Sequence, residues 1–137
     1  MFTKIIENKD LNNLVKFLNT SPSEYWKTHY LLDEVSVKKS KNLGMMTIQN
    51  IIINTVAPLL VAYGKYKDEQ VYIDKAVELL QQLTAEQNKI TRTWNDLGMK
   101  VKTSFDSQSL IELYNNFCQR RQCLNCSIGI SILKPKP

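Results

Sequence analysis

Apolar residues recur at helical spacing along most of the chain, and this pattern predicts an all-α fold. The clearest case is a helix that follows Thr47, a candidate N-cap. From Ile48 to Tyr63, apolar residues recur every three or four positions. The other faces of this stretch are apolar too, so we expect a core helix that is nearly surrounded. Pro58 lies inside it and would clash with the carbonyl four residues earlier, which predicts a kink.

Shorter helices follow from the same spacing. They are expected at residues 10–18, 69–83, 84–97 and from 104 or 106 to about 119. Thr84 and Gln87 have capping-box spacing at the start of the third of these, and Gly98 is well placed to end it. Beyond residue 119 the apolar pattern fits either a short helix or a strand, and we favour the helix. Together these elements predict a compact bundle of about six or seven helices with a cysteine-containing C-terminal segment.

Another helix start is predicted at Ser21. Ser21 as N-cap, a proline in the first turn and Glu24 three residues after the cap make a capping-box pattern. We expect this helix to carry His29 and to end near Asp33. The basic stretch that follows, residues 36–44, is expected to be a loop.

The composition indicates one domain with a hydrophobic core. The chain has 137 residues, 43% of them hydrophobic, and contains 4 glycines and 4 prolines, which disfavours an all-β fold with many tight turns. A chain of this length buries roughly 68% of the surface that its unfolded form exposes. A metal is therefore not needed merely to fold it, and we expect a single helical domain over residues 1–137.

Charge and targeting signals restrict the partners only in part. The net charge of +5, from 18 Lys and Arg against 13 Asp and Glu, permits nucleic acid as a partner without requiring it. The N-terminus lacks the apolar run of a signal peptide. The most apolar stretch, residues 48–63, is interrupted by polar residues and is shorter than the ~20 apolar residues of a membrane span. We therefore expect no membrane contact. An odd number of cysteines argues against a secreted disulfide framework, so we expect a cytoplasmic protein.

The cysteines are the strongest chemical signal. Cys118, Cys123 and Cys126 have C-x4-C-x2-C spacing, which can direct thiolates at one ion and indicates zinc or an iron–sulfur cluster. Tetrahedral zinc needs a fourth ligand, and His29 is the single histidine that this chain offers. The alternative is three reduced thiols, with Cys118 packed at the edge of the apolar face of the last long helix.

Basic residues supply candidates for phosphate contacts. Arg120 and Arg121 lie between the first two cysteines and could clamp a phosphate group. Lys38, Lys39 and Lys41, together with Lys100 and Lys102, could form a phosphate track. The alternative is that both sets are solvated, with the arginines favoured by the helix dipole. No glycine-rich phosphate loop, Ser–His–acid set or convincing carboxylate pair is visible, so no hydrolytic site is expected within this chain.

Three stretches of the sequence carry a family resemblance. They are residues 21–30 (SPSEYWKTHY), residues 53–65 (INTVAPLLVAYGK) and the stretch from DSQSL at 106–110 to CSIG at 126–129. They resemble the C-terminal part of the uncharacterised bacterial family DUF2851. Its members are considerably longer, which implies that residues 1–137 are the C-terminal domain of a longer protein. The N-terminal part of the family is similar to restriction-endonuclease-like nucleases, which implies that any catalysis lies outside this chain.

Two functions of different classes follow. The first is a helical accessory domain of a nuclease-like protein, with the cysteines on a structural metal and the basic residues positioning nucleic acid. Its expected partners are nucleic acid and the upstream nuclease-like domain. The second is a protein-interaction or scaffold domain with reduced cysteines and no metal. A thiol-redox or metal-sensing module is a third reading.

Overall fold

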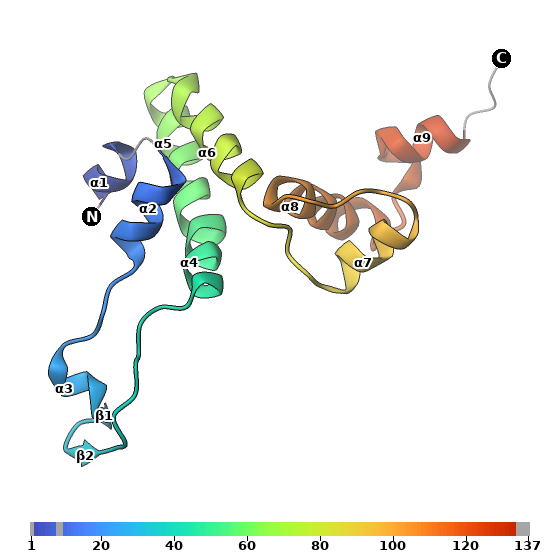
Figure 1. The fold of residues 1–137 in the computed structure, drawn as a ribbon. Coiled ribbons are helices and arrows are strands. Elements are labelled where there is room, and N and C mark those ends of the chain that lie inside the picture. Colours follow the sequence, from blue (N-terminus) through green and yellow to red (C-terminus); the bar gives the residue numbers. More distant parts are fainter. Residues whose placement is uncertain (1, 8–9, 134–137) are drawn as a thin grey trace. The chain divides into compact units, whose positions relative to one another are not determined.

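The computed structural model describes residues 2–7 and 10–133, which are mainly helical (Figure 1). Helices account for 67% of the structure, and the strands of the described residues form one two-stranded sheet, so the prediction of an all-α fold is confirmed. The chain consists of two compact units, Met1–Leu79 and Leu80–Pro137. A single domain over residues 1–137 stays a prediction.

The first unit is a group of helices around one apolar core (Figure 1). The central helical stretch consists of α4 (Met45–Ile51), a π turn and α5 (Ala57–Lys67). Around it lie α1 (Phe2–Glu7), α2 (Leu11–Leu18) and α6 (Gln70–Gln82), whose last residues belong to the second unit. As predicted, Asp10 caps α2, because its carboxylate accepts from the N–H of Asn13 at 2.7 Å. The core side chains of this unit include Leu14, Leu18, Ile48, Ile52, Val56, Leu60, Ala76 and Leu79.

The central helical stretch contains a π-helical turn just before its proline. The turn covers Ile52–Val56, and its closing bond runs from the N–H of Ala57 to the carbonyl of Ile52. Pro58 follows in the first turn of α5. Since proline has no N–H to donate, a widened turn lets the helix continue past the position where an ordinary bond is missing. The distortion that the sequence indicates at Pro58 therefore occurs as a π turn in the residues before it.

The helical stretch from Met45 to Lys67 also has the length and composition of a membrane span. It is 23 residues long and has a mean hydropathy of 1.5 over its apolar window. It is therefore longer than the apolar stretch of residues 48–63, which is too short to span a membrane. This is weak evidence, because a core helix passes the same test, and 33% of the window is buried inside the structure. The absence of membrane contact stays a prediction.

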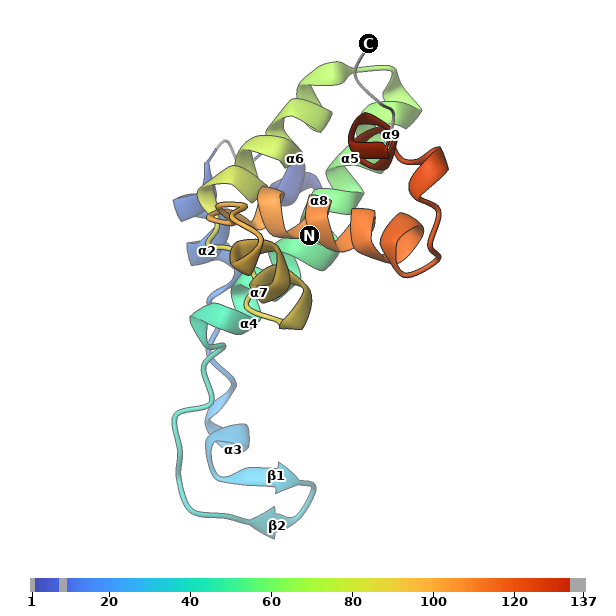
Figure 2. The same cartoon turned by 90° about the vertical axis from the view of Figure 1, so that its right-hand side faces the viewer.

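Residues 21–42, called the arm below, contain α3 (Glu24–Lys27) and the hairpin of β1 (His29–Leu31) and β2 (Glu34–Val35). The prediction of one helix from Ser21 to about Asp33 is wrong. The cap of α3 is Ser23, whose side chain makes no capping bond, and Asp33 has a left-handed φ of 63° that turns the chain back. Aspartate tolerates this conformation, and the flanking tyrosine and valine favour strands. Figure 2 shows that the arm extends beyond the N-terminal end of α4.

The second unit contains short helices joined by tight turns. They are α7 (Lys89–Asp96), α8 (Ser104–Leu113), the π turn η2 (Tyr114–Cys118), the 3-10 turn η3 (Cys123–Asn125) and α9 (Ser127–Leu133). The short helix predicted after the cysteines is confirmed as α9. Gly98 has a φ of 89° just past the end of α7, which is the terminating role predicted for it.

The helix start predicted at Thr84 is wrong because Thr84 is paired elsewhere. It forms an isolated β-bridge with Thr103, and its carbonyl accepts from the hydroxyl of Ser104 at 2.7 Å. α7 begins instead after Asn88, whose side chain accepts from the N–H of Thr91 at 3.0 Å. These contacts attach the start of α8 to the segment before α7, and a capping pattern cannot reveal them because they join residues far apart in the sequence.

Candidate functional site

The arm places three lysines around one depression. Backbone pairing continues beyond its strands, because the N–H of Ser36 donates to the carbonyl of Thr28 at 2.6 Å and that of Lys39 to the carbonyl of Lys27 at 3.2 Å. These bonds align the segment after β2 with the end of α3. The depression that results has a volume of about 320 Å³ and is lined by Ser21, Lys27, Lys38, Lys39, Ser40 and Asn42. Ammonium, hydroxyl and amide donors gathered in this way suit a phosphate group.

Glu24 offsets part of the positive charge at this depression. Its carboxylate pairs with the ammonium of Lys27, and that bond lowers the pKa of Glu24, with a further small lowering by the charge of Lys38. The pair is exposed and contributes little to stability. Within the described part of the chain, the ammonium groups of Lys38 and Lys39 make no hydrogen bond or ion pair, so they are the cations of the depression that remain available to a ligand.

Lys41, the third lysine predicted to contact phosphate, contacts the arm itself. Its ammonium donates to the carbonyl of His29 at 2.7 Å and lies 3.5 Å from the centre of the Tyr30 ring. A cation over an aromatic face contributes about 0.5–1 kcal/mol at an exposed site. Lys41 therefore holds the segment after β2 against β1.

His29 is held by neighbours within the arm. Its ring stacks on Tyr25, with the ring centres 4.0 Å apart and the planes at 4°. Its Nδ1 lies 2.9 Å from the carbonyl oxygen of Tyr25 and 3.1 Å from the hydroxyl of Thr28. The histidine packs the arm through one ring face and one nitrogen. It belongs to the first unit and the cysteines to the second, so its part in a metal site stays a prediction.

The arm has no core of its own. None of residues 19–47, all of them described, is buried. A two-stranded hairpin without a packed face is only marginally stable in water. The arm is thus held by the local hydrogen bonds and ring contacts above, and a partner that covered it would stabilise it. Its large exposed apolar side chains are Tyr25, Trp26, Tyr30, Leu31, Leu32, Val35 and Val37.

The three cysteines line one apolar pocket in the second unit. The pocket has a volume of about 210 Å³, and its walls include Trp94 and Phe117 beside Cys118, Cys123 and Cys126. Cys126 is buried, whereas the other two are exposed. The N–H of Cys126 donates to the carbonyl of Cys123 at 3.3 Å, which closes the tight turn between them. The structure therefore brings the predicted ligands to one place.

Gly129 sets how closely α9 approaches this turn. A Cβ at Gly129 would lie 2.2 Å from the carbonyl oxygen of Cys123, a distance that real Cβ atoms do not reach. The backbone of α9 therefore rests directly on the cysteine turn, and any larger residue must move one against the other.

The electrostatics of the pocket favour the protonated form of Cys118. Although Cys118 is exposed as a residue, slight burial raises the pKa of its thiol, and charge on Cys126 and Cys123 raises it further. A thiol with a raised pKa is a weaker nucleophile and metal ligand near neutral pH. Among the described residues, no group of three His, Cys, Asp or Glu side chains is arranged to hold a metal ion. The donors as placed do not fit a tetrahedral centre, and zinc or an iron–sulfur cluster stays a prediction.

Arg121 ends the helical stretch that carries Cys118. It has a left-handed φ of 55°. The N–H of Arg121 donates to the carbonyl of Cys118 at 3.1 Å, and that of Gln122 to the carbonyl of Phe117 at 2.9 Å. This is the Schellman pattern of a helix C-terminus, in which the left-handed position is usually glycine. Arg121 and its neighbour Arg120 are both exposed. Phosphate contacts by their guanidinium groups stay a prediction.

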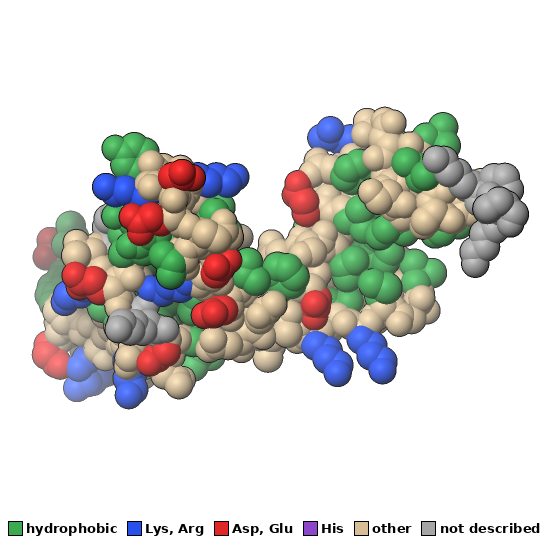
Figure 3. Space-filling view, turned by 90° about the horizontal axis from the view of Figure 1, so that it is seen from above, with side chains coloured by type: hydrophobic (Ala, Val, Ile, Leu, Met, Phe, Trp, Pro, Cys, Tyr) green, Lys and Arg blue, Asp and Glu red, His purple; other side chains and the backbone are tan. Residues whose placement is uncertain are grey.

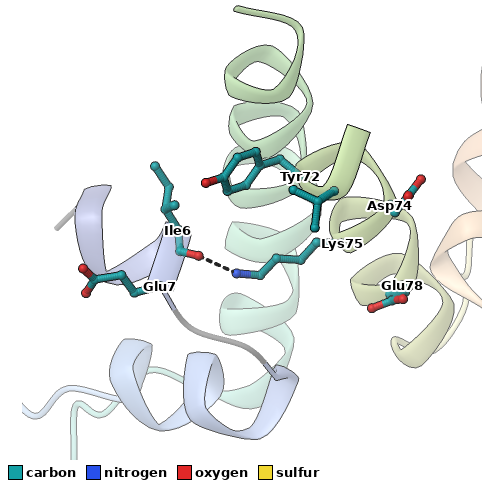
Figure 4. Close-up of a pocket in the computed structure, with 7 residues that line it drawn as sticks. Ile6, Glu7, Tyr72, Asp74, Lys75 and Glu78 are labelled. Atoms are coloured by element: carbon teal, nitrogen blue, oxygen red, sulfur yellow. Dashed lines mark hydrogen bonds between the residues drawn. The ribbon is translucent and has the colours of Figure 1, made fainter. Parts of the chain in front are cut away.

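A third pocket lies between α1 and α6 and was not expected from the sequence. It has a volume of about 780 Å³, and Lys75 reaches across it to donate to the carbonyls of Ile6 at 2.8 Å and Ile5 at 3.3 Å. Partial burial lowers the pKa of Lys75. Figure 4 shows Lys75 directed at Ile6, while Asp74 and Glu78 point away from it. The acidic groups do not converge on the amine, so Lys75 caps the end of α1 rather than forming a catalytic cluster.

The remaining surface offers no comparable basic site on the face that Figure 3 shows. There, Lys and Arg side chains are interspersed with Asp and Glu and form no continuous basic stripe.

A family model described as "Protein of unknown function (DUF2851)" matches residues 1–89 of the chain. The match covers more than half of the chain and includes the arm and the central helical stretch. It ends before the cysteines, so the third stretch that resembles the family, from residue 106 to residue 129, lies beyond it. Neither the curated proteins nor the solved structures include a match to the chain.

Proposed function

The chain belongs to the DUF2851 family of proteins of unknown function, and from this premise we propose that it is a helical accessory domain that contacts nucleic acid through its arm. One observation carries the proposal. The depression of the arm gathers Lys27, Lys38 and Lys39 with the polar side chains of Ser21, Ser40 and Asn42. Lysines in such a site neutralise phosphates and release the counterions bound to them.

The lack of a core in the arm supports the same function. A segment in which no residue from 19 to 47 is buried gains order when a partner covers it. The lysines suit a partner that carries negative charge, and the exposed aromatic rings suit one that has planar groups. Nucleic acid supplies both. In this proposal the domain holds nucleic acid for a nuclease-like domain upstream, which is the arrangement that the family resemblance implies. It does not depend on a metal at the cysteines.

Salt-dependent binding tests the proposal. Fluorescence anisotropy of a labelled oligonucleotide is measured from low to moderate salt with the unchanged chain, with K38A/K39A and with K100A/K102A. The two double variants remove the same charge, and Lys100 and Lys102 are exposed in the second unit. We expect K38A/K39A to weaken binding and to reduce the salt slope by about two phosphate contacts, whereas K100A/K102A leaves both nearly unchanged.

Two results would overturn the proposal. One is no binding by the unchanged chain at low salt. The other is an equal loss in both double variants, because this would show that affinity follows net charge and not the depression of the arm.

A second candidate is a protein-interaction domain, and a specific observation favours it. Leu31, Leu32, Val35 and Val37 are 61–82% exposed on one short hairpin. Clustered aliphatic side chains are typical of the centre of a protein interface. If the arm pairs with another copy of the chain, sedimentation will show a dimer that L32S/V35S converts to a monomer. A dimer of this kind, without nucleic-acid binding, would favour this function over the first.

A further inference from the structure

We propose that the arm binds unpaired nucleic acid in preference to duplex, with bases stacked on Tyr30 and Trp26. This rests on the proposed function and deepens it, because it names the form of nucleic acid that the arm recognises. The basis is that one aromatic ring of the arm is used in contacts within the arm, whereas two others keep a face that a ligand can reach.

Tyr25 is occupied by the arm itself. One face of its ring stacks on His29, with the centres 4.0 Å apart. Its hydroxyl accepts from the N–H of Asp33 at 3.0 Å, which ties α3 to the turn of the hairpin. Tyr25 therefore supports the other rings and is not itself a contact for a ligand.

Tyr30 and Trp26 keep open faces. Tyr30 is 62% exposed, and Lys41 lies over one face of its ring at 3.5 Å, which leaves the opposite face open. Trp26 is 40% exposed, and its contact with Tyr25 is T-shaped at 88°, which can occupy at most one indole face. Each ring has a neighbour within the arm, Lys41 for Tyr30 and Tyr25 for Trp26, and these contacts leave a face for a base.

The open rings belong to the same short segment as the lysines of the depression. Trp26 directly precedes Lys27, and the bond from the N–H of Lys39 to the carbonyl of Lys27 places the two lysines side by side. The bond from Lys41 to the carbonyl of His29 places the same segment beside Tyr30. A strand whose phosphates meet Lys38 and Lys39 therefore has aromatic faces within the same arm.

Unpaired strands can use these faces and duplexes cannot. Every base has a π-face, so stacking on aromatic side chains is tolerant of sequence. Inside a duplex those faces are already covered by neighbouring base pairs, and a protein must pay to unstack them. Lysine contacts alone would bind both forms, so the aromatic rings are what distinguishes them.

The test compares an oligo(dT) strand with a duplex of the same length at one low salt concentration. Tyr30→Leu and Trp26→Leu remove each ring but keep an apolar side chain, and Tyr30→Phe keeps the ring. Tyr66→Leu is the matched control, because Tyr66 is 83% exposed on α5 with Lys67 5.8 Å from its ring centre. In a Trp94→Phe background, the fluorescence of Trp26 also reports stacking directly.

We expect the unchanged chain to bind the strand more tightly than the duplex. Tyr30→Leu and Trp26→Leu should each weaken strand binding by roughly 5- to 150-fold, the loss of one stacked base, with little change for the duplex. Tyr30→Phe and Tyr66→Leu should bind as the unchanged chain does, and the strand should quench Trp26.

The inference fails if strand and duplex bind equally, or if Tyr30→Leu weakens both to the same extent. In that case a loss of binding in K38A/K39A would still support the proposed function, so the two failures can be told apart. If neither nucleic acid binds and the arm variants change the oligomeric state instead, both are overturned in favour of a protein partner.

Discussion

The ammonium of Lys41 lies 3.5 Å from the centre of the Tyr30 ring and also donates to the carbonyl of His29. These contacts join the two sides of an arm in which no residue is buried. Without a core, the order of the arm depends on a small number of such local contacts, and each of them can be removed separately.

Lys41→Met should loosen the arm. It removes a charged hydrogen bond and a cation–π contact, together about 1 kcal/mol or more, so we expect the backbone bonds of the arm to open several-fold more often. Hydrogen exchange at the amides of Ser36 and Lys39, which bond across the arm, measures this. Lys67→Met is the control, since Lys67 lies 5.8 Å from the Tyr66 ring. Unchanged exchange in Lys41→Met would refute the role given to Lys41.

Arg121→Gly should stabilise the second unit. Arg121 has a φ of 55°, a conformation that costs an L-residue roughly 1–2 kcal/mol. Glycine removes this strain but loses more backbone entropy, so we expect a net gain of up to about 1 kcal/mol. Urea unfolding followed by Trp94 fluorescence in a Trp26→Phe background measures it. Arg121→Val should destabilise, because a β-branched residue tolerates this conformation poorly. A stabilising valine would show that the helix ends differently in solution.

Gly129→Ser should displace α9 from the cysteine turn. The new Cβ would lie 2.2 Å from the carbonyl oxygen of Cys123, so the backbone must move at a cost of about 1–3 kcal/mol. We expect faster alkylation of Cys126 and a shifted emission of Trp94, which lines the same pocket. Gly44→Ser is the matched control, because nothing lies within 4 Å of a Cβ at that position. Equal behaviour of the two variants would contradict the close packing.

The alkylation of Cys118 should need a higher pH in the folded chain than in urea. Burial raises the pKa of this thiol, and the two neighbouring cysteines add to the shift. Mass spectrometry of iodoacetamide adducts at a series of pH values locates both midpoints. C123S/C126S should lower the folded midpoint only in part, because burial is the main cause. The folded state holds this proton more tightly than the unfolded state, so stability should fall as pH rises through the thiol range. A folded midpoint at or below the unfolded one would contradict this.

The metal prediction is decided by elemental analysis. Protein purified without oxygen should contain zinc, or iron with absorbance near the visible edge, if Cys118, Cys123 and Cys126 bind a metal. The metal content should then fall in C123S/C126S. A fully folded, metal-free chain with three titratable thiols would instead show that the cysteines are reduced residues around an apolar pocket.

Local sequence signals predicted the elements that depend on neighbouring residues. The cap at Asp10, the stop at Gly98 and the helix after the cysteines are confirmed, because each follows from contacts within one or two turns of chain. The start predicted at Ser21 and the one predicted at Thr84 are wrong. In the first case the hairpin turn at Asp33 competes with the helix, and in the second the bridge to Thr103 takes the place of the cap.

The candidate sites also differ in whether nearby residues could predict them. The clustering of Cys118, Cys123 and Cys126 in one pocket could be predicted from their spacing, since a short turn suffices to bring them together. The cap that Lys75 provides for α1 had no signal, because about seventy positions separate the two partners and no periodic pattern links them. The sequence by itself determined the helices, the charge of the arm and the cysteine cluster, since these depend on nearby residues. Only the tertiary structure decided that Lys41 and His29 are held by the arm, that Lys38 and Lys39 face a depression, and that no core covers them. The contacts of the arm depend on where the backbone turns back, as at Asp33, and burial depends on which segments pack together.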